Sequence, residues 1–281
     1  MPLASACVAS WVREVPFTEL LILNDGTLSA ASIERLEQLD LRARIVSREE
    51  SADIVSSKLR WNKYPGLRRL AETQPIARKL IDVPIMGDEW INYIDSDVFF
   101  YRGVDTLWTQ QVNDRGVWMM RDFQSAYAVA RWQYIPGLGP KLPKYANTGL
   151  ISCSAKCFDP DFLESVIKRH FSDSRLSSWL TEQTLWAAMA FRHGLSFYDS
   201  QLFALAVPEQ QRRLSNVVAL HWATPFRNVF REGCSAQPGA GRVMHFRLEP
   251  AERLTCRDVY SSFLKFSVDH EVARLRRVLG N

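Results

Sequence analysis

Short apolar runs alternate along this chain with segments whose apolar residues recur at helical spacing. The run Leu20-Leu21-Ile22-Leu23 is typical of a strand buried on both faces, and a helical pattern over residues 3–15 precedes it. Ser29 is placed to cap the next helix, and Thr181 to cap a later one that ends before Gly194. Further strands are expected at residues 43–47, 90–94, 116–120, 149–153 and 217–220. This alternation predicts one α/β domain with a mostly parallel or mixed sheet covered by helices.

Polar side chains stand just beyond several of the predicted strands. They are Asp25, Asp95, Asp97, Asp122 and His221. Ligands of open α/β sheets bind outside the carboxyl ends of the strands, so these side chains predict a binding site along that edge.

Asp95 and Asp97 are the most informative of the five. They are two residues apart in extended chain, so their side chains project from the same side. Carboxylates are hard oxygen ligands suited to Mg²⁺ or Mn²⁺, although acids after a strand also form turns or cap helices without any ligand. The buried strand before the pair and the apolar Val98-Phe99-Phe100 after it favour the metal interpretation.

Composition narrows the class of protein. The 281 residues, 47% hydrophobic and 23% charged, suffice for a full core. A net charge of +4, spread along the chain, suits an anionic small ligand better than nucleic acid, so no nucleic-acid partner is expected. The chain has no run of roughly 20 apolar residues, and residues 1–12 lack a signal-peptide pattern, which predicts a cytoplasmic protein. The five cysteines lack metal-site spacing and are expected to be free thiols.

The motifs resemble those of a known family. Ile91-Asn92-Tyr93-Ile94-Asp95-Ser96-Asp97-Val98 looks like the Asp-x-Asp segment of GT-A glycosyltransferases, especially the retaining glycogenin-like and lipopolysaccharide galactosyltransferase group. Further segments match by order along the chain: Leu21 to Thr27, Ala77 to Leu80, Asn147 to Leu150, Glu182-Gln183 and His221. The resemblance implies a GT-A fold, a mixed sheet flanked by helices. It also implies retaining transfer of a sugar from a nucleotide-diphosphate sugar, a UDP-sugar first among them, to a glycan, lipid-linked or protein acceptor.

The resemblance also implies a role for each matching residue. Mn²⁺ or Mg²⁺ would be held by Asp95, Asp97 and His221. Donor contacts would come from Asp25, Arg78, Lys79, Asp95, Asn147, Thr148, Gly149 and Arg227. The catalytic group would comprise Glu182, Gln183 and Asp122, with Asp122 binding the acceptor or, in an inverting enzyme, acting as general base.

Several of these roles have ordinary structural alternatives. Only one of the adjacent Arg78 and Lys79 can face the cleft, and Lys79 is favoured. Glu182 suits the first turn of a helix in any case, and Asp122 could be a solvated loop acid. Asp25 could merely make an Asx turn.

The start of the fold and its end are less regular. A GT-A fold opens with a strand that residues 3–8 are too short and too helical in period to supply. We therefore expect that first strand to be absent from this chain, which leaves an unpaired slot beside the strand at 20–23. The domain is expected to span residues 1–233. Residues 234–281 would add a helical extension packed on it, whose basic stretch 259–279 leaves a contact with a membrane surface open.

Two other functions stay open. A sugar nucleotidyltransferase would share the α/β half but usually needs a Gly-rich phosphate loop, which the sequence lacks. A catalytically impaired protein that binds sugar or a partner is favoured by the absent strand and by Thr224 and Arg227, where the family has Gly and Lys. Arg227 can still bind phosphate through its two-pronged guanidinium.

Overall fold

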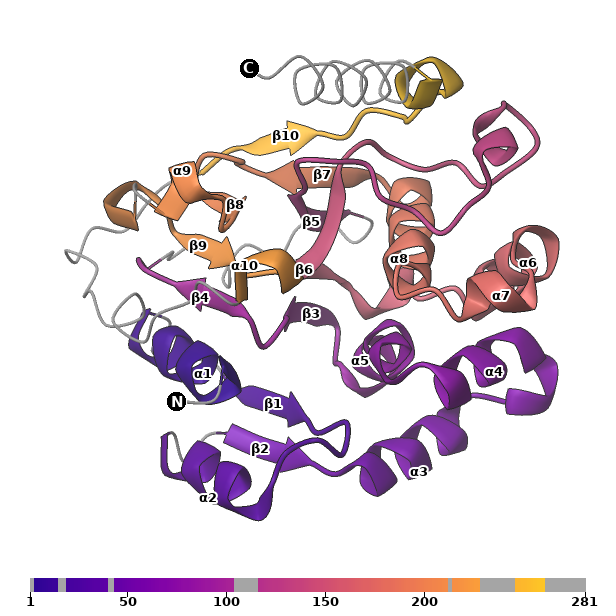
Figure 1. Cartoon of the computed structure of the whole chain (residues 1–281). Helices are drawn as coiled ribbons and strands as arrows, with labels where there is room; N and C mark the ends of the chain where they lie inside the picture. The colour runs from indigo at the N-terminus through magenta and orange to yellow at the C-terminus, as the bar shows by residue number, and fades with distance from the viewer. Residues whose placement is uncertain are drawn as a thin grey trace, which may run out of the picture.

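Helices and strands are interspersed along the chain in the computed structural model, which describes residues 3–14, 19–39, 43–103, 116–211, 214–227 and 246–260 (Figure 1). The strands are β1 (Leu20–Leu23), β2 (Ala43–Val46), β3 (Trp90–Ile94), β4 (Val98–Phe100), β5 (Val117–Arg121), β6 (Ala146–Ser154), β7 (Leu195–Tyr198), β8 (Phe203–Leu205), β9 (Ala219–His221) and β10 (Leu248–Pro250). The helices are α1 (Leu3–Glu14), α2 (Ala30–Leu39), α3 (Arg48–Lys58), α4 (Pro65–Thr73), α5 (Arg78–Met86), α6 (Pro160–His170), α7 (Asp173–Leu176), α8 (Thr181–Arg192), α9 (Pro208–Gln211) and α10 (Thr224–Arg227).

The described strands form three sheets. A five-stranded sheet has the order β10-β7-β5-β6-β3, a three-stranded sheet has the order β4-β9-β8, and β1 pairs with β2 alone. Neighbours run parallel in β1/β2, β5/β7 and β8/β9 and antiparallel in the other pairs. The prediction of a mixed sheet is therefore confirmed.

The apolar residues of the helices bury themselves against these sheets. The largest core cluster joins the five-stranded sheet to α4, α5, α6 and α8, through residues such as Leu67, Leu80, Leu163 and Leu185. Figure 1 shows these helices on the right of the view, and the three-stranded sheet on the left beside α1. Trp11 of α1 is buried in a second cluster with residues of β4 and β9.

β1 corrects one expectation from the sequence. The strand has the predicted bounds, but the prediction that it is buried on both faces is wrong, since Leu21 is 40% exposed. Among the described strands β1 pairs only with β2, so it lies outside the five-stranded sheet that the helices cover. Residues 3–8 lie in α1 and form no strand that pairs with β1. The expected absence of a first strand stays a prediction.

α8 and β10 add two further findings. Thr181 is the first residue of α8 and not its side-chain cap, because its hydroxyl donates to the Arg175 carbonyl (2.6 Å). β10, from the segment expected to be a helical extension, adds an edge strand to the five-stranded sheet by pairing with β7. Most of the helix expected at residues 259–279 lies outside the described residues.

Candidate functional site

The turn that carries Asp95 and Asp97 lies where two sheets meet. β3 ends just before it in the five-stranded sheet, and β4 begins just after it in the three-stranded sheet. The Asp95 N–H donates to the Gly149 carbonyl (2.8 Å), and the Trp222 N–H donates to the Asp97 carbonyl (2.8 Å). Main-chain bonds from both sheets therefore fix the two acids.

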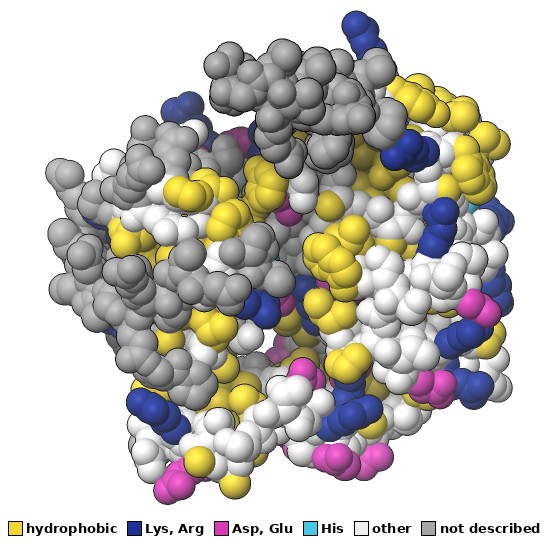
Figure 2. Space-filling view, viewed as in Figure 1, with side chains coloured by type: hydrophobic (Ala, Val, Ile, Leu, Met, Phe, Trp, Pro, Cys, Tyr) yellow, Lys and Arg dark blue, Asp and Glu magenta, His cyan; other side chains and the backbone are white. Residues whose placement is uncertain are grey.

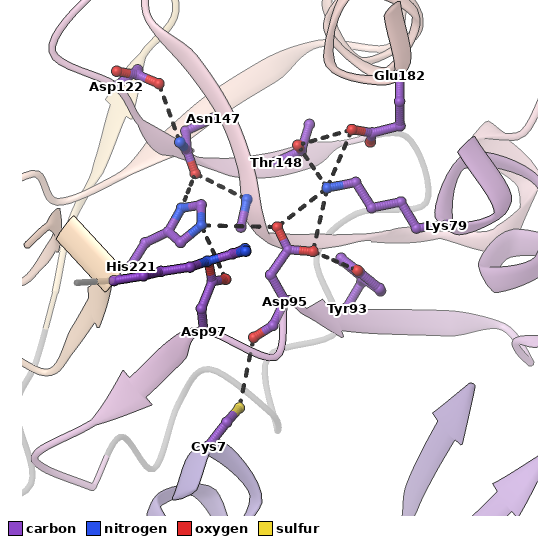
Figure 3. A network of polar contacts seen from close by, with 12 residues as sticks. Cys7, Lys79, Tyr93, Asp95, Asp97, Asp122, Asn147, Thr148, Glu182 and His221 are labelled. Atoms are coloured by element: carbon purple, nitrogen blue, oxygen red, sulfur yellow. Dashed lines mark hydrogen bonds and ion pairs between the residues drawn. The ribbon is translucent and has the colours of Figure 1, made fainter. Parts of the chain in front are cut away.

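His221 brings a third ligand-type side chain to this turn. It ends β9, directly opposite Val98 of β4. Its Nε2 lies 3.2 Å from Asp97 Oδ1 and 3.9 Å from Asp95 Oδ2 (Figure 3). One ligand atom from each of the three side chains lies within 4.8 Å of the others.

Asn147 fixes which nitrogen of the imidazole faces the acids. Its Oδ1 accepts from the Gly149 N–H (2.9 Å) and lies 2.8 Å from His221 Nδ1. Because this oxygen is an acceptor, Nδ1 must be the donor. Because Nδ1 is held in this way, Nε2 is the nitrogen that faces Asp97, and it is the one that could bind a metal ion.

The absence of a side chain at Gly149 makes room for the ring. A Cβ built there would lie 2.4 Å from His221 Nδ1 and 2.7 Å from its Cε1. Both distances are too short for non-bonded atoms, so any other residue would displace the imidazole. The packing of His221 therefore requires a glycine at position 149.

Lys79 links Asp95 to a second buried acid, Glu182. Its Nζ lies 3.2 Å from Asp95 Oδ2 and 3.2 Å from Glu182 Oε2, and donates to Thr148 Oγ1 (2.9 Å) (Figure 3). The Thr148 hydroxyl also lies 3.3 Å from Glu182 Oε2. In the described part of the chain, Glu182 Oε1 is buried and has no hydrogen-bond partner. One buried cation thus holds two acids that stem from different elements.

Burial and charge set the protonation of this group. Burial is the largest influence on Glu182 and raises its pKa to about 7, although Lys79 acts in the opposite direction. Burial alone would lower the pKa of Lys79, but Asp95 and Glu182 outweigh it and the pKa is raised. Lys79 therefore stays charged. Near neutral pH the Glu182 carboxyl is present in both its protonated and its ionised form.

Tyr93 is a further partner of Asp95. Its hydroxyl donates to Asp95 Oδ1 (2.5 Å), and Lys79 Nζ lies 5.5 Å from the centre of its ring. Burial, followed by the charge of Asp95, raises the pKa of Tyr93 well above its usual value, so the phenol remains a donor.

Arg227 holds the other acid. Its Nε and Nη2 lie 2.8 and 2.6 Å from Asp97 Oδ2, and its side chain remains half-exposed while Asp97 is buried. Burial would raise the pKa of Asp97, but His221 and Arg227 outweigh burial and the pKa is lowered. Arg227 thus reaches from the solvent side to the buried carboxylate.

Asp122 joins the site indirectly, through Asn147. Its Oδ2 accepts from Asn147 Nδ2 (3.2 Å), and its Oδ1 accepts from the N–H groups of Phe123 (2.7 Å) and Gln124 (3.2 Å). Burial raises its pKa. Gln183 points to the same segment, where its Nε2 donates to the Ala126 carbonyl (2.9 Å).

Two side chains expected at the site are engaged elsewhere. Arg78 pairs with Asp82 (2.9 Å) on its own helix and donates to the Arg48 carbonyl (3.2 Å). Asp25 accepts from the N–H (3.0 Å) and hydroxyl (2.6 Å) of Thr27, a local turn on the exposed end of β1. Lys79 rather than Arg78 lies against Asp95, and Asp25 keeps its alternative structural role.

The donor set fits a hard divalent cation. It combines two carboxylates, hard oxygen ligands that suit Mn²⁺ and Mg²⁺, with one imidazole nitrogen, a softer ligand. Asn147 and Gly149 orient the imidazole, as groups behind metal ligands usually do.

Solved structures of similar fold are glycosyltransferases. The chain is similar to mouse xyloside xylosyltransferase 1, with a TM-score of 0.53 and 12% identity over 80% of this chain and 92% of that one. It is also similar to the galactosyltransferase LgtC bound to donor and acceptor sugar analogs (TM-score 0.47, 15% identity, 79% and 84% covered). The bifunctional glycosyltransferase WbbM has a TM-score of 0.48 at 11% identity, with 79% of this chain and 44% of that chain covered. The likeness to the xylosyltransferase shows that the chain has the GT-A fold, as the resemblance implied.

Comparison of sequences adds nothing to this assignment. No family model matches the chain, and no curated protein matches it. Within the described ranges, no helix is both long and apolar enough to cross a bilayer.

Proposed function

We propose that this protein transfers a sugar from a nucleotide-diphosphate donor, a UDP-sugar first among them, to an acceptor, with the help of a divalent cation. The observation that carries this proposal is the convergence of Asp95, Asp97 and His221 at the junction of two sheets in a GT-A fold. In open α/β sheets such an edge is where ligands bind.

The three converging side chains would hold Mn²⁺ or Mg²⁺. Such an ion, when bound, would act as a Lewis acid that stabilises negative charge on the departing diphosphate. Arg227, whose guanidinium reaches Asp97 from the solvent side, would bind a phosphate oxygen of the donor. Gly149 and Asn147 would keep His221 in place.

Glu182 and its partners would act on the sugar. The buried carboxyl has one oxygen without a partner among the described residues and lies beside Lys79 and Thr148. There it could stabilise positive charge on the sugar or accept hydrogen bonds from the sugar hydroxyls. Gln183 follows Glu182 on α8 and would orient the segment around Ala126, to which it donates a hydrogen bond.

We propose retention of configuration at the transferred sugar. An inverting enzyme needs a general base near the acceptor, and Asp122 is the candidate. Both of its carboxylate oxygens already accept hydrogen bonds, from Asn147 and from two main-chain N–H groups. These three bonds occupy most of its roughly four lone-pair sites and anchor it to Asn147 and its own loop, which favours a role for Asp122 in holding the acceptor or Asn147 over one in removing a proton.

A binding protein without catalysis is the second candidate. It is favoured by the way Arg227 and Lys79 already neutralise Asp97 and Asp95 in this structure. Such a protein would bind a nucleotide diphosphate equally well with and without a metal ion.

A panel of nucleotide sugars tests the proposal. Release of the nucleotide would be measured with Mn²⁺, with Mg²⁺ and with a chelator. We expect turnover of at least one donor, loss of turnover in the chelator, and at least about a 100-fold loss in Asp97→Asn, since a Lewis acid contributes several kcal/mol. Asp173→Asn, an exposed acid paired with Arg69, is the matched control. Metal-independent turnover, or binding without turnover of any donor, would contradict the proposal.

A further inference from the structure

Residues 131–141 present a group of apolar side chains to solvent. Trp132, Ile135 and Leu138 are 55%, 40% and 49% exposed. Nine large hydrophobic residues are exposed in the described part of the chain, and three of the nine fall between residues 132 and 138. Single exposed apolar residues are ordinary on protein surfaces, whereas a group confined to one loop indicates an interaction site.

Hydrogen bonds of Gln133 hold the loop that carries these side chains. Buried Gln133 accepts from the Ala130 N–H (2.6 Å) and from Arg175 Nη1 (3.0 Å), and donates to the His170 carbonyl (2.9 Å). At Gly139 a Cβ would lie only 2.1 Å from the Gln133 carbonyl oxygen, so the returning chain passes against the outgoing one. The exposed side chains therefore project from a braced loop.

Charge selects the kind of partner. Arg131 and Lys141 flank the apolar residues, and the sequence holds no acidic residue between Asp122 and Asp159. An apolar tip with a tryptophan and basic flanks suits the surface of a bilayer, where the ring enters the interface and the cations meet anionic headgroups. Figure 2 shows hydrophobic side chains gathered at the upper right, the corner where Figure 1 places this loop.

We propose that residues 131–141 dock this protein on a membrane surface that contains anionic lipids, with Trp132, Ile135 and Leu138 inserted at the interface. The contact is separate from the candidate metal site. Its test therefore needs no donor, metal ion or acceptor.

Co-sedimentation with vesicles tests the contact. The probes are vesicles of phosphatidylcholine alone and of phosphatidylcholine mixed with phosphatidylglycerol. The full chain is expected to bind the mixed vesicles and to bind the neutral ones more weakly. The triple variant Trp132→Ser, Ile135→Ser, Leu138→Ser is expected to lose at least about tenfold in its partition to mixed vesicles, because it lacks the three apolar side chains that would enter the bilayer interface.

The chain offers a control matched in residue type. The triple variant Trp179→Ser, Ile76→Ser, Leu21→Ser removes the same three kinds of exposed side chain from scattered positions. It is expected to bind the mixed vesicles as the unaltered chain does. Circular dichroism and the thermal midpoint establish that both variants are folded, so that lost binding is not lost structure.

Three results would overturn the proposal. One is an unaltered chain that binds neither kind of vesicle, and another is equal binding by both triple variants. The third is an unaltered chain that self-associates through this loop, seen as a larger mass in light scattering that only the loop variant reduces, with no binding to vesicles. A second copy of the chain would then be the occupant.

Discussion

His221 fills the space where any residue other than Gly149 would have its Cβ. The resemblance placed Gly149 at the donor sugar, whereas the structure gives it a second reason, because its missing side chain is the space that the imidazole fills. A glycine can thus be required by a histidine 72 residues away in the chain, a requirement that no local pattern reveals.

Gly149→Ala tests this contact. The added methyl must displace His221 from Asp97, so we expect affinity for Mn²⁺ to fall about 10- to 100-fold, as when a group that orients a ligand is altered. Titration of Mn²⁺ followed by electron paramagnetic resonance measures the affinity. Gly137→Ala is a control for the loss of a glycine as such: its methyl would meet no atom within 4 Å, its φ of +88° confines the added strain to that surface turn, and it should bind Mn²⁺ normally. Unchanged affinity in Gly149→Ala would contradict the packing role.

Glu182 links the site to the pH dependence of stability. Its pKa of about 7 is above the ordinary value of 4.5, so between these values the folded chain binds more protons than the unfolded chain. The contribution of Glu182 to the free energy of unfolding therefore falls as pH rises from 4.5 to 7. Glu182→Gln keeps the shape of the neutral acid and removes this pH-dependent contribution to the free energy of unfolding.

We expect the thermal midpoint of Glu182→Gln to exceed that of the unaltered chain at pH 8. The difference should shrink as the pH is lowered to 5, where the unaltered carboxyl is neutral. Glu252→Gln, at an exposed acid, controls for the loss of a negative charge. A difference that is the same at both pH values would show that Glu182 is not held in its neutral form by burial.

Single residues differ in how far the sequence could predict them. Asp95 and Asp97 stood out because two acids followed a buried strand. Tyr93 was missed, although it is two residues before Asp95 and so faces the same side of the strand, which is a usable signal. The pairing of Arg227 with Asp97 spans 130 residues and could come only from the fold.

At the scale of elements, α1 braces β4, the strand that follows the turn carrying Asp95 and Asp97. The buried Ser10 hydroxyl accepts from the Phe100 N–H of β4 (3.0 Å) and donates to the Cys7 carbonyl (2.7 Å). Arg13 also donates to the Phe100 carbonyl (2.9 Å). The helix thus ties down both polar groups of one β4 residue.

Ser10→Ala measures what this brace contributes. It takes a partner from a buried N–H, so we expect about 1–3 kcal/mol less free energy of unfolding in urea. Ser5→Ala is the matched control, because Ser5 is buried on the same helix and its hydroxyl has no partner within the described residues. It should be neutral or slightly stabilising. Equal effects of the two substitutions would contradict the bracing role.

Elements with many residues were easier to predict than short ones. The strand at 90–94 has the expected bounds, and the helix expected over residues 3–15 is described over Leu3–Glu14, because each shows enough residues to define a period. β4, β8 and β10, with three residues each, were not predicted, since three residues are too few for a period to show; β9 is as short, but the apolar run at 217–220 indicated it. The burial of β1 was predicted wrongly because an apolar run indicates a strand but not whether other elements cover it.

At the scale of the whole molecule, the candidate site is a property of the junction between sheets. Asp95 and Asp97 lie between β3 and β4, which belong to different sheets, and His221 comes from β9 of the smaller one. The sequence predicted a mixed sheet and a ligand site at its edge. It could not predict that the strands divide into three groups, because pairing between distant strands leaves no mark on their composition.

Mn²⁺ binding in the presence of UDP tests the central claim most directly. The loss of free-ion signal in electron paramagnetic resonance would be followed for the unaltered chain, for Asp97→Asn and His221→Gln, and for Asp173→Asn as a control. We expect one ion per chain, normal binding in the control, and affinity lowered at least about tenfold in each of the two site variants. Binding that is absent from the unaltered chain, or equal in all four proteins, would contradict a metal site at Asp95, Asp97 and His221.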